Sequence, residues 1–290
     1  MILVKRLLRL QTNPLRNHLQ KSLRNVQSNR HFVYGNGESR KGFSVKNYGG
    51  VSWGCNAIYR DTAVDNLVVV DYAMQGEVYD NDYPKNHKCW FTDWNPIPSD
   101  PFMIDTFTKD FDDNKIFEYG FDYGTCVING SHPQVVEQKV NEIKDDFPHL
   151  DKNDLQLKMN KDLGLHIIYD NPQVDKIESI SDPRNWCAGS TAVHLACQNG
   201  AEEVYMFGFD LSTYNDNINN IYKGSKNYLP ETAKGFNAAN WRSQLYITFN
   251  EYSKVKFKWV GNDFRYINNS KIMDCKNVEL LTYDNIGDIR

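Results

Sequence analysis

Four segments hold residues that could carry chemistry, and each accompanies a short apolar run. The first is Gly35-Asn36-Gly37-Glu38-Ser39, which follows a strand-like run. A glycine-rich turn of this kind exposes backbone N–H groups and lets a phosphate or a ribose approach the main chain. The same pattern is also typical of an ordinary tight turn, so the segment alone leaves both interpretations open.

Two further segments place a polar side chain directly after an apolar run. Asn56 follows Ser52-Trp-Gly-Cys, and its amide could hydrogen-bond a base edge or a sugar hydroxyl because it both donates and accepts. Asp71 follows the apolar run Leu67–Val70 and could hold a sugar hydroxyl. The alternatives are a turn-forming asparagine and an aspartate that caps the next helix.

The fourth segment extends from residue 186 to residue 210. Gly189, Ser190 and Thr191 open a helix of small residues, whose first amides could meet an anion. Gly200 is expected to end this helix, and the next strand leads to Asp210. His194 lies inside the predicted helix, and we interpret it as a structural residue.

The sequence offers little for a metal site. Asp110 and Asp112 match the Asp-x-Asp pair that can hold a divalent cation, but they follow no buried strand, and a solvated loop is the preferred interpretation. The six cysteines are spread out without a Cys-x-x-Cys pair. This spacing indicates neither a zinc site nor a disulfide framework.

The apolar pattern predicts the elements that must position these residues. Strands are expected at 31–35, 51–53, 67–71, 88–92, 125–129, 165–169, 203–207 and 254–260, and helices at 133–144, 190–199 and 238–252. Such alternation indicates the α/β class, with a mostly parallel sheet and helices on both faces. Ligands of these sheets gather at the carboxyl ends of strands. Residues 213–228 are interpreted as a flap over that edge, and 92–113 and 145–162 as insertions or surface loops.

Charge is distributed unevenly along the 290 residues. Residues 1–30 carry seven basic side chains and no acid, whereas the whole chain has a net charge of −4. The acidic remainder argues against a nucleic acid as partner. Residues 2–26 also have a loose helical apolar period, typical of an anchor on an anionic membrane, of an oligomer arm, or of a helix packed on the body. The first ten residues lack the apolar core of a secretory signal, and we expect a cytoplasmic protein with at most peripheral membrane contact.

Taken together and in this order, the segments resemble the sialyltransferase-like glycosyltransferases of bacterial and animal type. They resemble in part the related motility accessory factors and pterin-diphosphokinase-like proteins. Residues 35–39 are similar to the family's Gly-Asn-Gly-x-Ser loop, and Cys55-Asn56 to its Arg/Cys-Asn element. Residues 187–210 are similar to its second long motif, a Ser/Thr-Gly turn, a helix and a Tyr-x-x-Gly-Ile/Phe-Asp strand. The likeness spans residues 31–75 and 185–260, about 40% of the chain.

The resemblance implies a single Rossmann-like domain over residues 31–265, between a basic helical arm (1–30) and a C-terminal tail (266–290). It implies transfer of a sugar from a nucleotide-activated donor, CMP-linked, to a glycan acceptor, with no metal or other cofactor. By position it assigns the donor-binding residues Gly35, Asn36, Gly37, Ser39, Asn56, Asp71, Gly189 and Ser190. It also places Tyr214 and Tyr222 where such enzymes stabilise the departing phosphate. The two glycine turns would then form one cradle for a ribonucleotide.

One departure from the family concerns the catalytic base. These transferases use a histidine ahead of the last helix, where this chain has Asn237, which resembles a helix cap. Glu231, Asp216 or Asp210 would have to replace the histidine, with Glu231 the first choice. Two alternatives follow: a non-catalytic binding or assembly protein, and an ATP-dependent diphosphotransferase acting on a pterin-like substrate. The second has little support because no Gly-x-x-x-x-Gly-Lys occurs.

Overall fold

The computed structural model describes residues 29–43, 45, 48–92, 94–95, 125–129, 140–141, 144–145, 151–152, 165–169, 176–181, 184, 186–212, 216–235, 237–268 and 270–286. The chain divides into two compact units. The first comprises residues 1–53, 189–224 and 229–290, and the second comprises 54–188 and 225–228.

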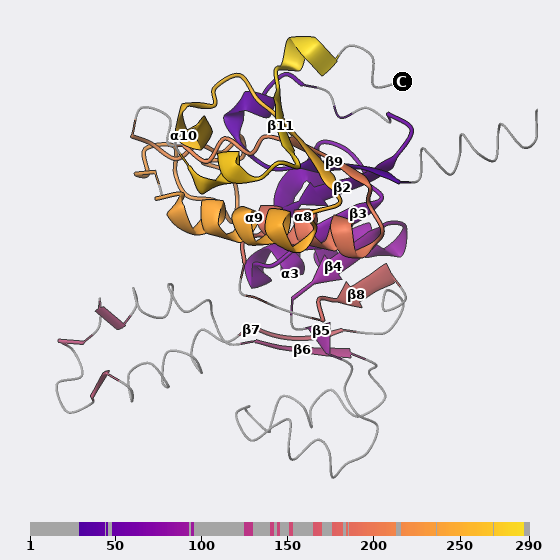
Figure 1. Cartoon of the computed structure of the whole chain (residues 1–290). Coiled ribbons are helices and arrows are strands. Elements are labelled where there is room, and N and C mark those ends of the chain that lie inside the picture. The colour runs from indigo at the N-terminus through magenta and orange to yellow at the C-terminus, as the bar shows by residue number, and fades with distance from the viewer. Residues whose placement is uncertain are drawn as a thin grey trace, which may run out of the picture. The chain divides into compact units, whose positions relative to one another are not determined.

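An eight-stranded parallel sheet in the order β11-β10-β9-β1-β2-β3-β4-β8 organises the chain (Figure 1). Its strands are β1 (Arg30–Tyr34), β2 (Val51–Cys55), β3 (Asn66–Val69), β4 (Lys88–Phe91), β8 (Ile177–Ser179), β9 (Glu203–Phe207), β10 (Lys256–Val260) and β11 (Val278–Leu281). The order proceeds outward from β1 to β8, and β9 then pairs with the other edge of β1. The expected α/β, Rossmann-like class is therefore confirmed, and the direction of strand addition reverses between β1 and β9.

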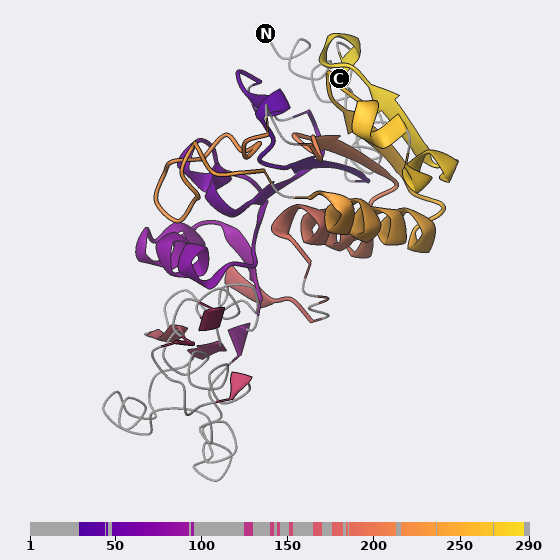
Figure 2. The ribbon, with the colours of Figure 1, turned by 90° about the vertical axis from the view of Figure 1, so that its left-hand side faces the viewer.

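In the first unit, α8 (Ala188–Gln198) and α9 (Ala239–Glu251) run side by side (Figures 1 and 2). Phe249 of α9 packs against Phe257 and Trp259 of β10, with ring centroids 4.5 and 6.2 Å apart. Small residues of α8 are fully buried, among them Ala192 and Ala196. Gly200, at φ +87°, closes α8 with hydrogen bonds from its own amide to Cys197 and from Ala201 to Ala196, so the predicted end of this helix is confirmed.

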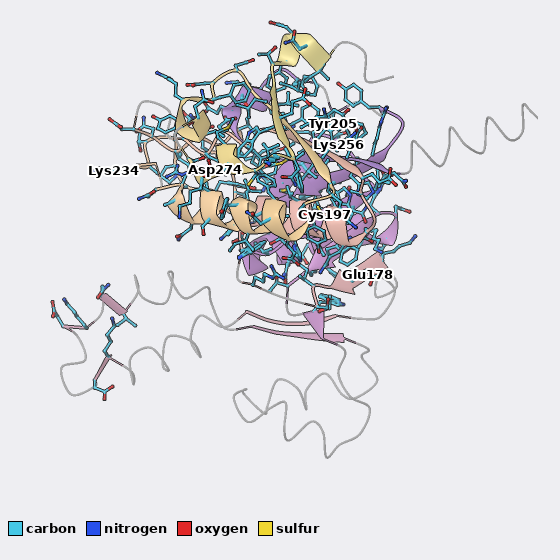
Figure 3. All side chains as sticks on the ribbon, in the orientation of Figure 1. Glu178, Cys197, Tyr205, Lys234, Lys256 and Asp274 are labelled. Carbon is cyan, nitrogen blue, oxygen red and sulfur yellow. The ribbon has the colours of Figure 1, made fainter. Side chains whose placement is uncertain are left out.

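Aromatic side chains occupy one face of β1 and β9. The register pairs Phe32 with Tyr205 and Tyr34 with Phe207, and the rings of both pairs stack at 5.1 Å. Tyr205 is labelled in Figure 3. Phe43, from the segment between β1 and β2, stacks on Phe207 at 5.1 Å. The described part of this connection contains a 3₁₀ turn over Glu38–Arg40 and no α-helix, and side chains of the connection cover the sheet face instead.

The remaining elements of the first unit follow β10. They are α10 (Arg265–Asn268), a 3₁₀ turn over Lys271–Asp274, strand β11 and a 3₁₀ turn over Tyr283–Ile286. Strand β11, which lies in the segment 266–290 that was expected as a C-terminal tail, pairs in parallel with β10. The strand was not predicted, because Val278–Leu281 is an apolar run of only four residues interrupted by Glu279.

The second unit adds a helix that the apolar pattern did not predict. Helix α3 (Tyr72–Asp80) follows β3, with 3₁₀ turns over Asn56–Arg60 and Tyr83–Lys85 around it. Gly76 and the acidic residues of α3 weaken its helical period, and Met74 and Val78 supply the buried contacts. Gln75 is also buried, and its Nε2 donates to the carbonyl oxygens of Val69 and Thr92.

Two predicted strands belong to a different sheet. Strands β6 (Thr125–Asn129) and β7 (Leu165–Tyr169) pair antiparallel with each other, and β5 (Trp94–Asn95) joins them in a three-stranded sheet. The positions were predicted correctly, but their membership of the parallel sheet was wrong. Apolar runs of five residues define a strand without defining its partner.

Several expectations fall outside the described residues. They include the arm over residues 1–28, the pair Asp110 and Asp112, most of the helix at 133–144 and most of the loops at 92–113 and 145–162. No helix among the described residues is long and apolar enough to span a membrane.

Candidate functional site

The loop after β1 and the loop after β9 meet at the point where the strand order reverses. The amide of Gly35 donates to the carbonyl oxygen of Phe207 at 2.8 Å, and the amide of Gly37 donates to that of Gly208 at 2.9 Å. A Cβ atom on Gly35 would lie 2.7 Å from the Gly208 carbonyl oxygen, and one on Gly37 would lie 2.6 Å from the same atom. Glycine is therefore required here for the contact between the two loops.

The next two amides of this loop are also bonded inside the protein. Glu38 N–H donates to Oδ1 of Asn219 at 2.7 Å, and Ser39 N–H donates to Oδ2 of Asp210 at 2.9 Å. These amides, with those of Gly35 and Gly37, were expected to face a phosphate. Because all four donate to protein oxygens, none of these four amides is free to bind a phosphate.

Asp210 is the half-exposed carboxylate of this edge. Its side chain lies against Gly37, whose added Cβ would approach the Asp210 Cγ to 2.6 Å. A carboxylate held at a strand end can accept hydrogen bonds from sugar hydroxyls or take a proton from one. The sequence singled out Asp210 for this second role.

Two residues of this edge were missed by the sequence reasoning. Arg40 is only 4% exposed, and it donates from Nε to the Gly35 carbonyl oxygen at 2.9 Å and from Nη2 to the Tyr222 hydroxyl at 3.3 Å. The Tyr283 hydroxyl lies 3.4 Å from the Ser39 hydroxyl. Burial raises the pKa of Tyr283, as does the charge of Asp210, whereas the charge of Arg40 acts in the opposite direction. Only the position of Arg40 beside the glycine loop could have drawn attention to it.

The predicted flap is attached to the glycine loop over part of its length. Ile221 N–H donates to the carbonyl oxygen of Asn36 at 2.9 Å, and Lys223 forms an ion pair with Glu38 at 2.5 Å. Tyr222 is buried, in agreement with a place beside this edge. Tyr214 lies outside the described residues.

Other predicted residues of the first unit lie as follows. Gly189 and Ser190 form part of the first turn of α8; Ser190 is 1% exposed, and a Cβ on Gly189 would lie 3.2 Å from the Phe209 ring. Glu231 is exposed and lies beside Gly224. His194 is buried edge-on against Tyr252, with the ring centroids 5.4 Å apart, which fits its structural interpretation.

In the second unit, Asn56 and Asp71 contact each other. Nδ2 of Asn56 donates to Oδ2 of Asp71 at 2.8 Å. Asn56 adopts a left-handed backbone, φ +48°, and its buried Oδ1 makes no hydrogen bond within the described part of the chain. Asp71 occupies the N-cap position of α3, but its side chain makes no capping hydrogen bond. The cap alternative is therefore correct in position and wrong in contact, because the carboxylate meets Asn56.

A charged network lies beside this pair in the same unit. Arg60 donates from Nε and Nη2 to the two oxygens of Glu77, each at 2.7 Å. The Tyr59 hydroxyl donates to Glu77 at 2.6 Å, and Asn227 does so at 2.8 Å. Burial, together with Glu77, raises the pKa of Tyr59 to about 12. The network holds residues 225–228, because Arg60 also donates to Ser225 at 2.9 Å.

Within the described ranges, no group of three or more histidine, cysteine or acidic side chains is arranged to hold a metal ion. Comparison of the chain with protein-family models, with curated proteins and with solved structures gives no match. The class that fold and site define is thus a Rossmann-like α/β protein with a polar edge at its strand reversal.

Proposed function

We propose that this chain is a glycosyltransferase of the sialyltransferase type that takes a nucleotide-activated sugar, a CMP-linked one, as its donor. The observation that carries the proposal is the strand reversal between β1 and β9, with the Gly35 loop and Asp210 at that edge. Ligands of open parallel sheets bind at such reversals. The sequence likeness of the same two loops to the transferase motifs adds the substrate class.

The contacts of the described residues support a separate role for each candidate site residue. Asp210 would accept hydrogen bonds from the ribose hydroxyls of the donor or remove the proton from the acceptor hydroxyl. Its carboxylate is half-exposed and accepts a hydrogen bond from the Ser39 amide. Tyr222 would support the departing phosphate. Glu231, the first choice from the sequence, is the other candidate for the base and lies at an exposed position. In the second unit, Asn56 with Asp71 supplies a second polar pair after strands.

A binding screen tests the first requirement. Thermal unfolding is followed with CMP, UDP, GDP and ATP, the last also with Mg²⁺. We expect CMP to raise the midpoint most. A preference for ATP with Mg²⁺ would favour the diphosphotransferase, and no response to any nucleotide would contradict the proposal.

Turnover is tested separately, by the release of CMP from a CMP-sugar in the presence of glycan acceptors. Asp210→Asn keeps an oxygen that can accept from the Ser39 amide but removes the carboxylate base. Glu231→Gln removes the carboxylate of the other candidate base. Loss of a general base should lower the rate about 10²–10⁴-fold in one of the two variants. Asp284→Asn, at an exposed position beside Tyr283, is the control for the loss of one negative charge.

A non-catalytic binding protein of the same fold is the second candidate, and Asn237 favours it. Its Oδ1 accepts a hydrogen bond from the amide of Ala239 at 2.9 Å, at the start of α9. Ala238 occupies the N-cap position of α9, so the expected cap at Asn237 lies one residue too early; Asn237 binds the first amide of the helix and, being an amide, supplies no base. CMP binding without release of CMP from any donor, in wild type and variants alike, would favour this candidate over the transferase.

A further inference from the structure

Arg40 carries a charge that the described residues leave without an acidic partner. An arginine side chain stays protonated at every pH that a folded protein meets. Its side chain is 4% exposed, so water contributes little to its solvation. A buried charge is costly unless it is paired with an opposite charge.

The hydrogen bonds of Arg40 go to neutral oxygens. Nε and Nη2 donate to the Gly35 carbonyl and to the Tyr222 hydroxyl, and no carboxylate of the described residues lies within ion-pair distance of the guanidinium. The two acids of this loop region have other contacts, because Glu38 pairs with Lys223 and Asp210 accepts from Ser39. A guanidinium has five N–H groups, and these bonds use two.

The location of Arg40 indicates what the remaining donors could meet. The residue follows the loop at the carboxyl end of β1, where the strand order reverses, and its Nε bond fixes the guanidinium against that loop. Asp210 holds the Ser39 amide of the same loop. A carboxylate suits sugar hydroxyls, and a planar guanidinium suits a phosphate.

We propose that Arg40 forms a phosphate subsite at the β1–β9 edge, where it neutralises the phosphate of a bound ligand. The assignment of this phosphate to a nucleotide rests on the proposed function, whereas the subsite itself rests on the buried charge. A nucleotide and inorganic diphosphate share the required chemistry, and separate measurements distinguish them.

The experiment compares three probes by isothermal titration: cytidine, CMP and inorganic diphosphate. The variants are Arg40→Met, which removes the charge at similar length, Arg40→Lys, which keeps it, and Lys223→Met as the control. Lys223 is the neighbouring cation, with its side chain 21% exposed and paired with Glu38. Its loss changes the net charge of this edge by the same amount.

In the wild type we expect CMP to bind at least about tenfold more tightly than cytidine, as a charge-assisted hydrogen bond implies. Arg40→Met should abolish that ratio and the binding of diphosphate, and Arg40→Lys should retain part of both. Lys223→Met should keep the ratio near that of the wild type. Circular dichroism checks that each variant is folded. If Arg40→Met does not fold, the ratio of CMP to cytidine affinity in the wild type and in Arg40→Lys decides whether the subsite exists.

Two results would overturn the subsite: equal affinity of the wild type for CMP and cytidine with no diphosphate binding, or a folded Arg40→Met that keeps the wild-type ratio. If CMP and cytidine bind equally well, the proposed nucleotide binding is supported, but the phosphate subsite at Arg40 is contradicted. Diphosphate binding that depends on Arg40, with no binding of cytidine or CMP, supports the subsite and contradicts the nucleotide function.

Discussion

The contact between the two glycine loops can be tested by adding single methyl groups. Gly208 has φ +69°, and its added Cβ would lie 2.8 Å from the Gly35 carbonyl oxygen. Gly35 has no positive φ, yet its Cβ would lie 2.7 Å from the Gly208 carbonyl oxygen. Gly200 has φ +87° with nothing within 4 Å of an added Cβ. An alanine at Gly200 therefore tests backbone strain alone, one at Gly35 tests close approach to the other loop alone, and one at Gly208 tests both.

The expected costs follow from these differences. Gly200→Ala should cost about 1 kcal/mol, because only the left-handed backbone opposes the methyl group. Gly35→Ala should cost about 1–3 kcal/mol through overpacking against rigid backbone. Gly208→Ala combines both effects and should cost about 2–4 kcal/mol. In a chain of this size, each kcal/mol lowers the thermal midpoint by roughly 2–4 °C.

Thermal unfolding of the three variants, followed by near-ultraviolet circular dichroism, measures the order. The double variant Gly35→Ala/Gly208→Ala should cost less than the sum of its parts, because one separation of the loops accommodates both methyl groups. The reasoning is refuted if Gly208→Ala is no less stable than Gly200→Ala, or if Gly35→Ala has the wild-type midpoint. Either result would mean that the loops do not touch as described.

Three further predictions concern charge, reactivity and the start of α9. Burial raises the pKa of Glu77, but hydrogen bonds from its partners, including Arg60, outweigh this effect and the net pKa is lowered from 4.5. The stabilisation is therefore present above about pH 4.5 and is lost as the pH falls below it, so urea midpoints of wild type and Glu77→Gln should converge in acid. Burial raises the pKa values of Cys89 and Cys197, and mass mapping should find both unlabelled by thiol reagents until urea is added; labelling of the folded chain at either would contradict their burial. Asn237→Ala should lower stability by about 1 kcal/mol, because the Ala239 amide at the start of α9 loses its hydrogen bond to Oδ1 of Asn237, and an unchanged thermal midpoint would show that this bond does not stabilise the helix.

The comparison of single elements explains which parts were predictable. The strand positions at β1, β9 and β10 followed from apolar runs, because parallel strands are buried on both faces and such runs are local in sequence. Helix α3 was missed because its sequence has only a weak apolar period. Strands β6 and β7 were found but assigned to the wrong sheet, since pairing depends on residues far apart in the chain.

By itself, the sequence determined the α/β class, most strand positions, the end of α8 at Gly200 and the polar residues at strand ends. The tertiary structure alone decided that the amides of Gly35, Gly37, Glu38 and Ser39 donate to protein oxygens. It also decided that Asp71 meets Asn56 and that Arg40 is buried without an acidic partner among the described residues. The reason is physical. Local propensity depends on neighbours in the chain, whereas hydrogen-bond partners and desolvation depend on groups that only folding brings together, such as Arg40 and Tyr222.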